Sequence, residues 1–477
     1  EEAVSTLSWL AALSEEGRGR LQQALHYVCV AIIPSLTQTT QEISNLLLAL
    51  DGGYVEPGPG GAPTSGQADV LPTGRNFYSI DPRTLPTPTA WEIGCIMGDD
   101  VIARYIEEEG RYPESVGIVL WATSNMRSHG QCIAQFLYLL GVRPVWQKGS
   151  LRVVDLEIIS LQELKRPRID ATGRISGLFR DSMPMASAWL DQAVAMVAAL
   201  EESDEDNFIR KHVAADAQEM EQEGVDKETA WKEASWRIFG DPPGTYGAGV
   251  SAVLEAKNWE TLDDLSGVYV RWGGHAYSGG EKGSYRPDLF RRRMGSLDIT
   301  IQNQDNREIS ILNSDDYNAY HGGMIAAVRS SKGEAPRSYC GDSTERKKVR
   351  MRSVQEELRR MFRGEAINPK FIEGMKKHGY KGAADLANYV AHSYQWDATS
   401  DIMEDWMYEK YAAKYALDEA MQAWMKDVNP WALQRIAETL LEAAQRGMWQ
   451  VDDQMKQELE SLLLDLEGDL EERGDAD

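Results

Sequence analysis

The run Val116–Ala122 (VGIVLWA) is the feature that most constrains the fold. It is apolar, has the length of one strand and shows no polar alternation. A strand of this kind has to be covered on both faces, which is typical of a parallel sheet between layers of helices. Helix and strand patterns alternate around it: helices are expected at Trp91–Glu109, Gln131–Leu140 and Pro184–Leu200, and strands at Arg143–Trp146, Val153–Ile159 and Ala171–Phe179. We therefore predict an α/β fold with a doubly wound parallel sheet layer, whose switch-point crevice lies near Trp121–His129.

The rest of the chain predicts large helical regions around that layer. We expect a helical N-terminal segment (1–50), an ordered Pro/Gly-rich loop (51–90), a Rossmann-like α/β domain (91–200), a mixed and mainly helical domain with short strands (201–343) and an all-helical C-terminal domain (344–477). The short strands are expected at Asp298–Gln302 and Ser338–Gly341. Asn368-Pro369 and Asn429-Pro430 each place a capping residue before a proline at a helix start.

Composition excludes several classes of function. The 477 residues carry a formal charge of −25, which argues against a nucleic-acid partner. No apolar run approaches the ~20 residues that a membrane span requires. The four cysteines are far apart and form no CxxC pair, so a reducing cytoplasm is the expected location. The chain opens on Glu1 without Met or a signal peptide, and we expect that it is a piece of something longer.

The loop Asp51–Glu92 is too rich in proline and glycine to form a helix or a regular strand. A flexible linker would lack its aromatic anchors, which include Tyr54, Phe77 and Trp91. Long loops of compact domains are usually disordered or functional. We expect this one to be ordered, with Arg75 and Asn76 among its polar residues.

Two strings carry candidate chemistry. The first, Ile301–Arg329, holds Asp305, Asp315, Asp316 and His321 before Gly322-Gly323. Imidazole and carboxylate suit cobalt, nickel or zinc, and a neutral histidine also accepts protons. The alternative is a helix capped by Ser314 or Asp315 with a histidine packed at a glycine turn, and spacing alone favours this alternative.

The second string, Asn368–Leu386, holds Glu373 and His378. The two lie five residues apart, which matches one helix face poorly. Two interpretations of this pair remain equally open: the residues belong only to a capped helix, or they line a binding pocket. No GxxxxGK[ST] motif occurs in the chain, so we expect any ATP to be bound elsewhere.

Several strings in order resemble the large subunits of the metal-inserting tetrapyrrole chelatases. These are the CobN subunit of cobaltochelatase and its magnesium chelatase relative ChlH/BchH. The matching strings include LPTGRNFYSIDPRTLPTPTAWEIG, VGIVLWATSNMRSHGQ, WRIFGDPPGTYGAGV, the HGG at residues 321–323 and WDATSDIMEDWMYEKY. The resemblance covers nearly the whole chain, and the first string and the HGG are closest to the cobalt branch.

The resemblance implies the tetrapyrrole-binding region of an ATP-dependent cobaltochelatase large subunit. Such an enzyme inserts Co²⁺ into hydrogenobyrinic acid a,c-diamide in cobalamin biosynthesis. Mg-ATP is hydrolysed by an AAA+ ATPase subunit, which works with a von Willebrand-type adaptor subunit. Family chains are more than twice as long, so the N-terminal part of the large subunit is an expected partner. A magnesium chelatase acting on protoporphyrin IX and a non-catalytic tetrapyrrole- or partner-binding module remain alternatives.

The resemblance also implies roles for individual residues. His321 and Asp316 become the candidates for metal delivery and for removal of the pyrrole protons. Arg75 and Asn76 are candidates for binding the peripheral carboxylates or amides of the macrocycle. Trp121 offers a flat ring on which a macrocycle can stack, and Glu373 and His378 are candidates for lining its pocket.

Overall fold

The computed structural model describes residues 13–61, 63, 66–78, 80–345 and 348–474. The chain forms two compact units, Glu1–Asp81 and Pro82–Asp477. The second contains the sheet and the helical C-terminal part. Within the described residues, no helix is both long and apolar enough to cross a membrane.

The larger unit is built on an eight-stranded sheet with the order β12-β11-β10-β3-β6-β7-β8-β9. The middle strands β11, β10, β3, β6 and β7 run parallel, while β12, β8 and β9 pair antiparallel at the edges. The chain builds outward from β3 through β6 to β7, and then returns to add β10 and β11 on the other side of β3. This order confirms the doubly wound prediction, and it places the switch point between β3 and β10. The strands are β3 (Ser115–Leu120), β6 (Asp170–Ile175), β7 (Ile238–Gly240), β8 (His275–Ala276), β9 (Ser284–Tyr285), β10 (Ile299–Ile301), β11 (Arg337–Asp342) and β12 (Arg350–Ser353).

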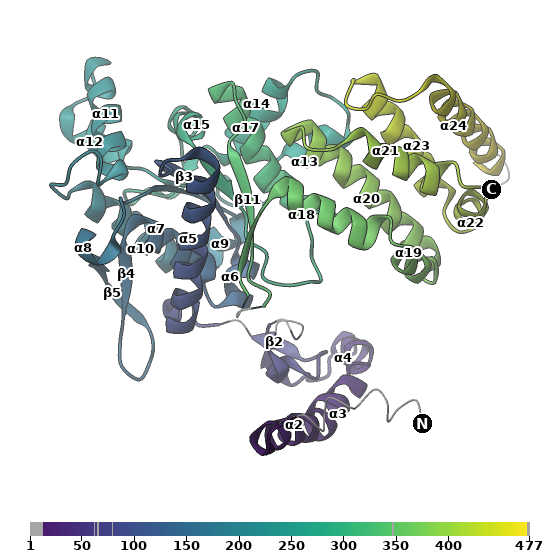
Figure 1. Ribbon diagram of the computed structural model, residues 1–477, viewed down its shortest axis with the longest axis horizontal. Coiled ribbons are helices and arrows are strands. Elements are labelled where there is room, and N and C mark those ends of the chain that lie inside the picture. The colour runs from purple at the N-terminus through teal and green to yellow at the C-terminus, as the bar shows by residue number, and fades with distance from the viewer. Residues whose placement is uncertain (1–12, 62, 64–65, 79, 346–347, 475–477) are drawn as a thin grey trace. The chain divides into compact units, whose positions relative to one another are not determined.

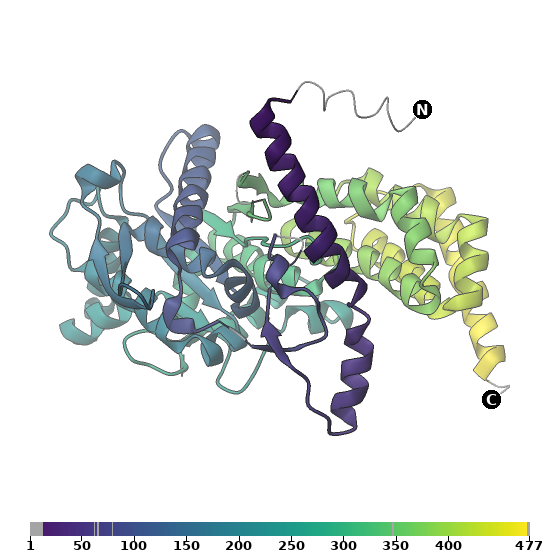
Figure 2. The ribbon, with the colours of Figure 1, turned by 90° about the horizontal axis from the view of Figure 1, so that it is seen from below.

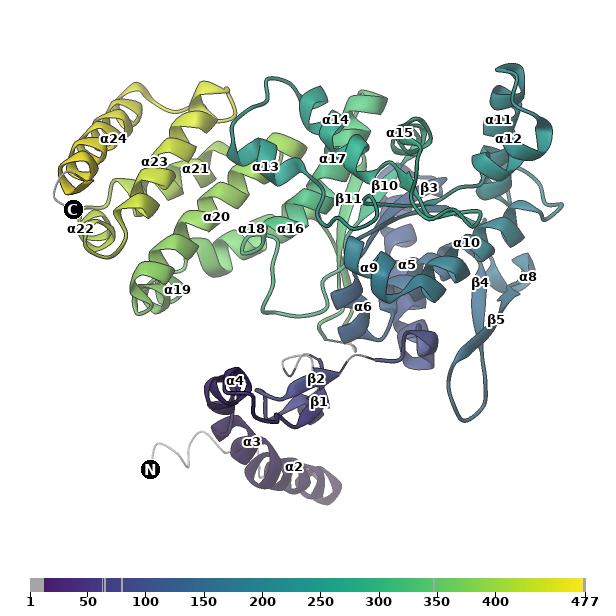
Figure 3. The ribbon, with the colours of Figure 1, turned by 180° about the vertical axis from the view of Figure 1, so that it is seen from behind.

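Helices cover both faces of the sheet (Figures 1 and 3). One face carries α5, α7 and α10, and the other carries α14 and α17. Every residue of β3 is buried, as its apolar run predicts. The helices of this part are α5 (Pro88–Glu109), α6 (Ala122–Ser128), α7 (Gln131–Leu140), α8 (Leu161–Leu164), α9 (Gly177–Ser182), α10 (Pro184–Ala198), α11 (Phe208–Gln222), α12 (Lys227–Ala234), α13 (Val250–Glu255), α14 (Leu262–Gly273), α15 (Pro287–Ser296), α16 (Asp315–Tyr317), the π-helix η6 (Asn318–Gly322) and α17 (Gly323–Lys332), with the 3-10 turn η5 (Pro82–Thr84).

Two of the expected strands lie outside this sheet. β4 (Val142–Trp146) and β5 (Val153–Ile158) form a separate antiparallel pair. Val154, Asp155 and Glu157 of β5 are exposed, so this strand does not have the two buried faces that a central parallel strand needs. The expectation that these strands belong to the parallel layer was wrong, although both strands exist.

The C-terminal part beyond β12 is helical, with α20, α23 and α24 side by side in Figures 1 and 3. Its core is rich in large aromatic side chains such as Trp396, Trp449 and Tyr408. Its helices are α18 (Val354–Met361), η7 (Phe362–Ala366), α19 (Pro369–Lys376), α20 (Gly379–Ser400), α21 (Asp405–Tyr411), η8 (Ala412–Ala416), α22 (Glu419–Val428), α23 (Pro430–Gln445) and α24 (Asp453–Gly474).

The long helix α20 joins this helical part to the sheet part. Trp396 donates its indole N–H to the carbonyl of Ile311 (2.7 Å), and His392 Nδ1 lies 2.8 Å from the carbonyl of Leu312. At the end of the helix, Thr399 accepts a hydrogen bond from Asn318. Since every residue from Tyr389 to Ser400 is buried, α20 belongs to both parts.

The smaller unit combines helices with the Pro/Gly-rich loop. Figure 2 shows the helical run of α2, η2 and α3, followed by α4. Ser14 caps α2 by accepting a hydrogen bond from the backbone of Gly17. The loop holds a short parallel pair of strands, and its order stays a prediction. The elements are α2 (Glu15–Tyr27), η2 (Val28–Ile32), α3 (Ile33–Thr37), α4 (Gln41–Leu50), β1 (Pro57–Pro59), η4 (Ala68–Val70) and β2 (Asn76–Tyr78).

The five domain boundaries expected from composition stay predictions. The sheet takes strands from residues 115–353 and so extends beyond the segment 91–200.

Candidate functional site

Polar and aromatic residues follow the carboxyl ends of three of the parallel strands. Trp121 follows β3, Gln302–Asp305 follow β10, and Asp241 follows β7. Ligands of doubly wound folds bind at this edge, beside the switch point. We therefore expect the candidate site in the two segments that follow β3 and β10.

An ion pair joins the segment that follows β3 to the segment that follows β10. Arg127 of α6 donates to both carboxylate oxygens of Asp305, at 2.7 and 3.0 Å, and Ser124 donates to the same carboxylate at 2.9 Å. The fork of the guanidinium matches the carboxylate, and the pair is largely buried. It fixes α6 to the turn after β10.

The residues after β10 form a buried polar cluster with unmet hydrogen-bonding capacity. Among the described residues that contain a buried polar atom without a hydrogen-bond partner, three follow β10 (Gln302, Asn303 and Gln304) and two lie on η6 (Asn318 and His321). Such an atom costs about 1–3 kcal/mol, so buried polar atoms are normally paired with protein or ordered water. Such atoms also occur elsewhere in the described chain, but the three consecutive residues after β10 bring several of them to the switch-point edge.

His321 lies on η6 and is completely buried. Its Nε2 lies 3.0 Å from the hydroxyl of Thr300 on β10. Thr300 donates onward to Ser338 (2.9 Å), and Ser338 donates to the carbonyl of Pro336 (3.3 Å). Because the Thr300 proton is used toward Ser338, Nε2 has to donate, and Nδ1 carries the free lone pair. Burial lowers the pKa of His321 to about 3, so the imidazole is neutral at pH 7.

The two glycines after His321 are explained by close packing. A Cβ on Gly323 would lie 2.4 Å from the ring of Tyr269 on α14, and one on Gly322 would lie 2.3 Å from the amide nitrogen of Asn318. The two glycines are therefore needed because neighbouring side chains of the protein pack directly against the backbone here.

Asp316 lies on α16, five residues before His321, and its side chain is exposed. The protein around the carboxylate and the nearby charge of Asp315 raise its pKa. Within the described residues, no hydrogen bond joins Asp316 to His321. The structure thus places one member of the predicted pair at the surface and the other in the interior.

Trp121 is half-buried and caps the start of α6. Its ring meets the rings of Tyr317 (4.9 Å) and Tyr320 (5.7 Å) edge to face. Tyr320 in turn contacts a fully buried ion pair between Arg174 of β6 and Asp241, with its hydroxyl 3.3 Å from the carboxylate. The tryptophan thus lies at the switch-point edge and contacts the helix turn that carries His321.

Arg75 and Asn76 belong to the smaller unit. The Arg75 guanidinium donates to the carbonyls of Asp69 (3.0 Å), Val70 (3.0 Å) and Pro72 (3.1 Å), so it acts as a clamp on its own loop. A Cβ on Gly58 would lie 2.4 Å from Arg75 Nε, which explains a glycine there. Asn76 is exposed and donates its backbone N–H to Glu56.

Glu373 and His378 are exposed near the junction of α19 and α20. Glu373 forms an ion pair with Lys376 (3.0 Å), and Asn368 caps α19 by accepting from the backbone of Lys370. These contacts belong to a capped helix. The pocket roles of these two residues, like all the roles assigned from sequence, stay predictions.

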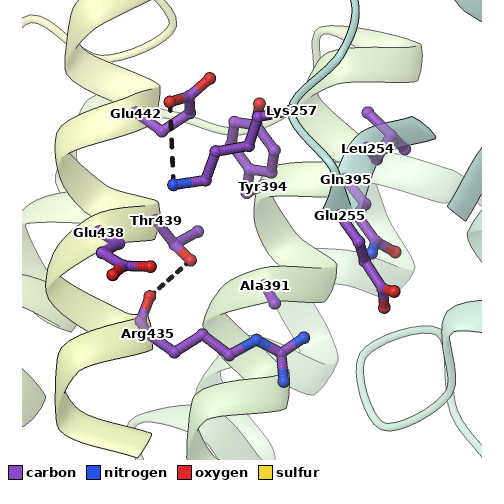
Figure 4. A pocket seen from close by; sticks show the side chains of 10 residues that line it. All are labelled: Leu254, Glu255, Lys257, Ala391, Tyr394, Gln395, Arg435, Glu438, Thr439 and Glu442. Carbon is purple, nitrogen blue, oxygen red and sulfur yellow. Dashed lines mark hydrogen bonds and ion pairs between the residues drawn. The ribbon is translucent and has the colours of Figure 1, made fainter. Parts of the chain in front are cut away.

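A cavity of about 430 Å³ lies away from these residues, between α13, α20 and α23 (Figure 4). Tyr394 and Gln395 of α20 line it, and Lys257 faces Glu442 across it at 3.9 Å. None of the residues predicted from sequence lines it. Within the described residues, no cluster of three or more His, Cys, Asp or Glu side chains is arranged to hold a metal ion.

Sequence reasoning missed the partners that organise the switch-point edge. It named Asp305 but not Arg127, and it did not anticipate the Arg174–Asp241 pair or Thr300. One usable signal was present: polar residues follow directly after β10 in the string QNQD. The partners themselves are far apart in sequence, by 178 residues for Arg127 and Asp305.

Comparison with known proteins gives the family. A sequence model described as CobN/Magnesium Chelatase matches residues 3–456. An uncharacterized protein of Methanocaldococcus jannaschii is 48% identical over 442 residues, which are 93% of this chain and 36% of that protein. The aerobic cobaltochelatase subunit CobN of Pseudomonas aeruginosa is 45% identical over 446 residues (93% and 36%), and the chloroplastic magnesium-chelatase subunit ChlH of Oryza sativa subsp. indica is 35% identical over 434 (90% and 31%). The chain thus spans about a third of the length of these relatives.

A solved structure agrees with this result. The catalytic subunit of cobaltochelatase from Mycobacterium tuberculosis matches with a TM-score of 0.91 and 43% identity, over 98% of this chain and 40% of that chain. Its likeness extends across both the sheet part and the helical part. The chain therefore belongs to the CobN/magnesium chelatase family.

Proposed function

We propose that this chain is the tetrapyrrole-binding region of a CobN-type cobaltochelatase large subunit. Co²⁺ is then the substrate metal and hydrogenobyrinic acid a,c-diamide the acceptor, in cobalamin biosynthesis. Mg-ATP is hydrolysed by the AAA+ partner and coupled through the von Willebrand-type adaptor. The observation that carries the proposal is the higher identity with the Pseudomonas aeruginosa CobN (45%) than with the Oryza sativa ChlH (35%) over nearly the whole chain. The cytoplasmic location stays a prediction.

A titration of the chain with each tetrapyrrole tests this assignment. We expect quenching of tryptophan fluorescence by hydrogenobyrinic acid a,c-diamide and weaker quenching by protoporphyrin IX. Binding of the porphyrin alone would replace the cobalt assignment with a magnesium chelatase. Binding of the corrinoid without metal insertion, even with all partner subunits present, would favour the non-catalytic binding module.

Within this region we propose that His321 and Asp316 deliver the metal and accept the pyrrole protons. Insertion requires a base for the two pyrrole protons and a ligand that hands over the ion. A neutral imidazole whose Nδ1 lone pair is held free by the Thr300–Ser338 relay has the required form. Because His321 is buried, η6 has to move before Nδ1 can meet a substrate.

We expect His321→Ala to retain tetrapyrrole binding and to abolish insertion in the reconstituted complex. The loss of a buried, hydrogen-bonded ring should also lower the free energy of unfolding by about 1–3 kcal/mol. His392→Ala is the matched control, since His392 is also buried and hydrogen-bonded but lies on α20. The control should lose comparable stability and keep insertion. An active His321→Ala protein would remove His321 from the site.

A further inference from the structure

The helices of the smaller unit carry apolar side chains that nothing within that unit covers. No described residue of α2, η2, α3 or α4 is buried. More than half of the large apolar side chains that are exposed in the described chain lie between Leu25 and Tyr54. We call those on the helices the N-terminal apolar surface: Leu25, Val28, Val30, Ile33, Leu36, Ile43, Leu46, Leu47, Leu48 and Leu50.

The pattern on α4 is that of a helix with a packing partner. Ile43, Leu46, Leu47 and Leu50 follow the i, i+3, i+4, i+7 spacing of one helix face, and their exposures are 69, 60, 61 and 77%. Burying each such side chain is worth about 1.5–3 kcal/mol. A helix of 10 residues is marginal in water without tertiary packing, and large exposed apolar patches mark interaction sites.

Relatives such as the Pseudomonas aeruginosa CobN are longer than this chain and align with it over only part of their length. We propose that the N-terminal apolar surface binds the polypeptide that corresponds to the rest of such a large subunit. This inference rests on the proposed function, because it assumes a complete large subunit. The surface lies inside the region shared with the family, residues 3–456. The CobN relative of Pseudomonas aeruginosa is matched over only 36% of its length, so most of its chain is available to cover the equivalent helices.

Charge argues against two other occupants. A second copy would bring together two chains that each carry −25, which opposes self-association. A membrane surface attracts helices rich in Lys and Arg, whereas residues 15–50 carry two arginines, no lysine and three glutamates. The remainder of the large subunit needs neither a basic face nor a symmetric contact.

The test is binding of the full chain to that remainder, supplied as a separate polypeptide and followed by sedimentation velocity. We expect a 1:1 complex, with a Kd that rises at least tenfold in Leu46→Glu/Leu50→Glu. Leu464→Glu is the matched control, since Leu464 is 69% exposed on α24, and it should bind like the unchanged chain. If the double variant does not fold, the single variant Ile43→Asn replaces it.

Three binding results would each overturn the inference: no complex at micromolar concentrations, equal binding by the Glu variants, or self-association of the chain that these variants abolish. A fall of several degrees in the Tm of the chain alone in the Glu variants would also overturn it, because the surface would then pack on this chain. The measurement uses neither tetrapyrrole nor metal. If the complex forms but no tetrapyrrole binds, the interface stands and the proposed function is wrong. If tetrapyrrole binds but no complex forms, the proposed function stands and the interface is wrong.

Discussion

Gly323 shows at the scale of one residue how closely the turn after His321 is packed. Its Cα faces the ring of Tyr269, and a methyl group there would lie 2.4 Å from a ring carbon. We expect Gly323→Ala to lower the free energy of unfolding by about 1–3 kcal/mol, because an added carbon in a filled interior forces its neighbours apart.

Gly295→Ala is the control for this prediction. Gly295 is also helical, on α15, but the nearest atom to a new Cβ is 3.6 Å away. Alanine is favoured over glycine in helices, so this change should leave stability unchanged or raise it by up to ~1 kcal/mol. Urea denaturation of both variants gives the comparison, and equal effects would contradict the packing argument.

Asp397 gives the protein a pH-dependent stability term. Its carboxylate accepts hydrogen bonds from Tyr408 (2.9 Å) and from the backbone of Met403 (3.0 Å), yet burial raises its pKa to about 6. The folded state therefore keeps the proton longer than the unfolded state does. Stability should fall by roughly 2–3 kcal/mol as the pH rises from about 4 to 7.

The variant Asp397→Asn should remove that term, because an amide does not ionise. The measurement is the difference in unfolding free energy between the two proteins across this pH range. A constant difference would show that Asp397 does not titrate there.

At the scale of elements, the sequence predicted the helices and strands that are specified by a local pattern of residues. β3, α5 and α7 were found because long apolar patterns specify them. β7 was missed, since three residues carry little periodicity and its place depends on pairing with β6. β12 was also missed: Arg350–Ser353 is polar, and it becomes a strand by adding to the edge of β11. β4 and β5 were found, but local patterns do not say which sheet a strand joins.

The same limit applies to the candidate site. The segment around Trp121 was placed at the switch point because the order of strands and helices implies it. The burial of His321 and its relay to Thr300 and Ser338 depend on how η6 packs on β10, which no local pattern encodes.

The Pro/Gly-rich loop can be tested as an element through Arg75. Its guanidinium ties residues 69–72 to the start of β2, so Arg75→Gln should speed proteolytic cleavage of this loop several-fold. Arg20→Gln is the control, because Arg20 is exposed on α2 and pairs only with Glu16 in the contacts described. Unchanged cleavage together with lost tetrapyrrole binding would instead show that Arg75 binds substrate.

At the scale of the whole molecule, the chain should not bind ATP by itself. It contains no GxxxxGK[ST] motif, and its glycine-rich runs do not connect a strand to a helix in the way that a phosphate loop requires. Calorimetry with Mg-ATP should show no binding at micromolar concentrations, with an AAA+ ATPase of the kind proposed above as the positive control. Micromolar affinity for the isolated chain would contradict this prediction.

Helix α20 links the helical part of the larger unit to the turn that carries His321. Near its middle it is bonded to the helical part through Ser393 and Tyr411, and at its end Thr399 holds Asn318 on the turn of His321. Because α20 is a single helix from Gly379 to Ser400, we expect a displacement of the C-terminal helices to be transmitted to η6. A partner that binds the helical part would then shift the position of His321 without touching the sheet.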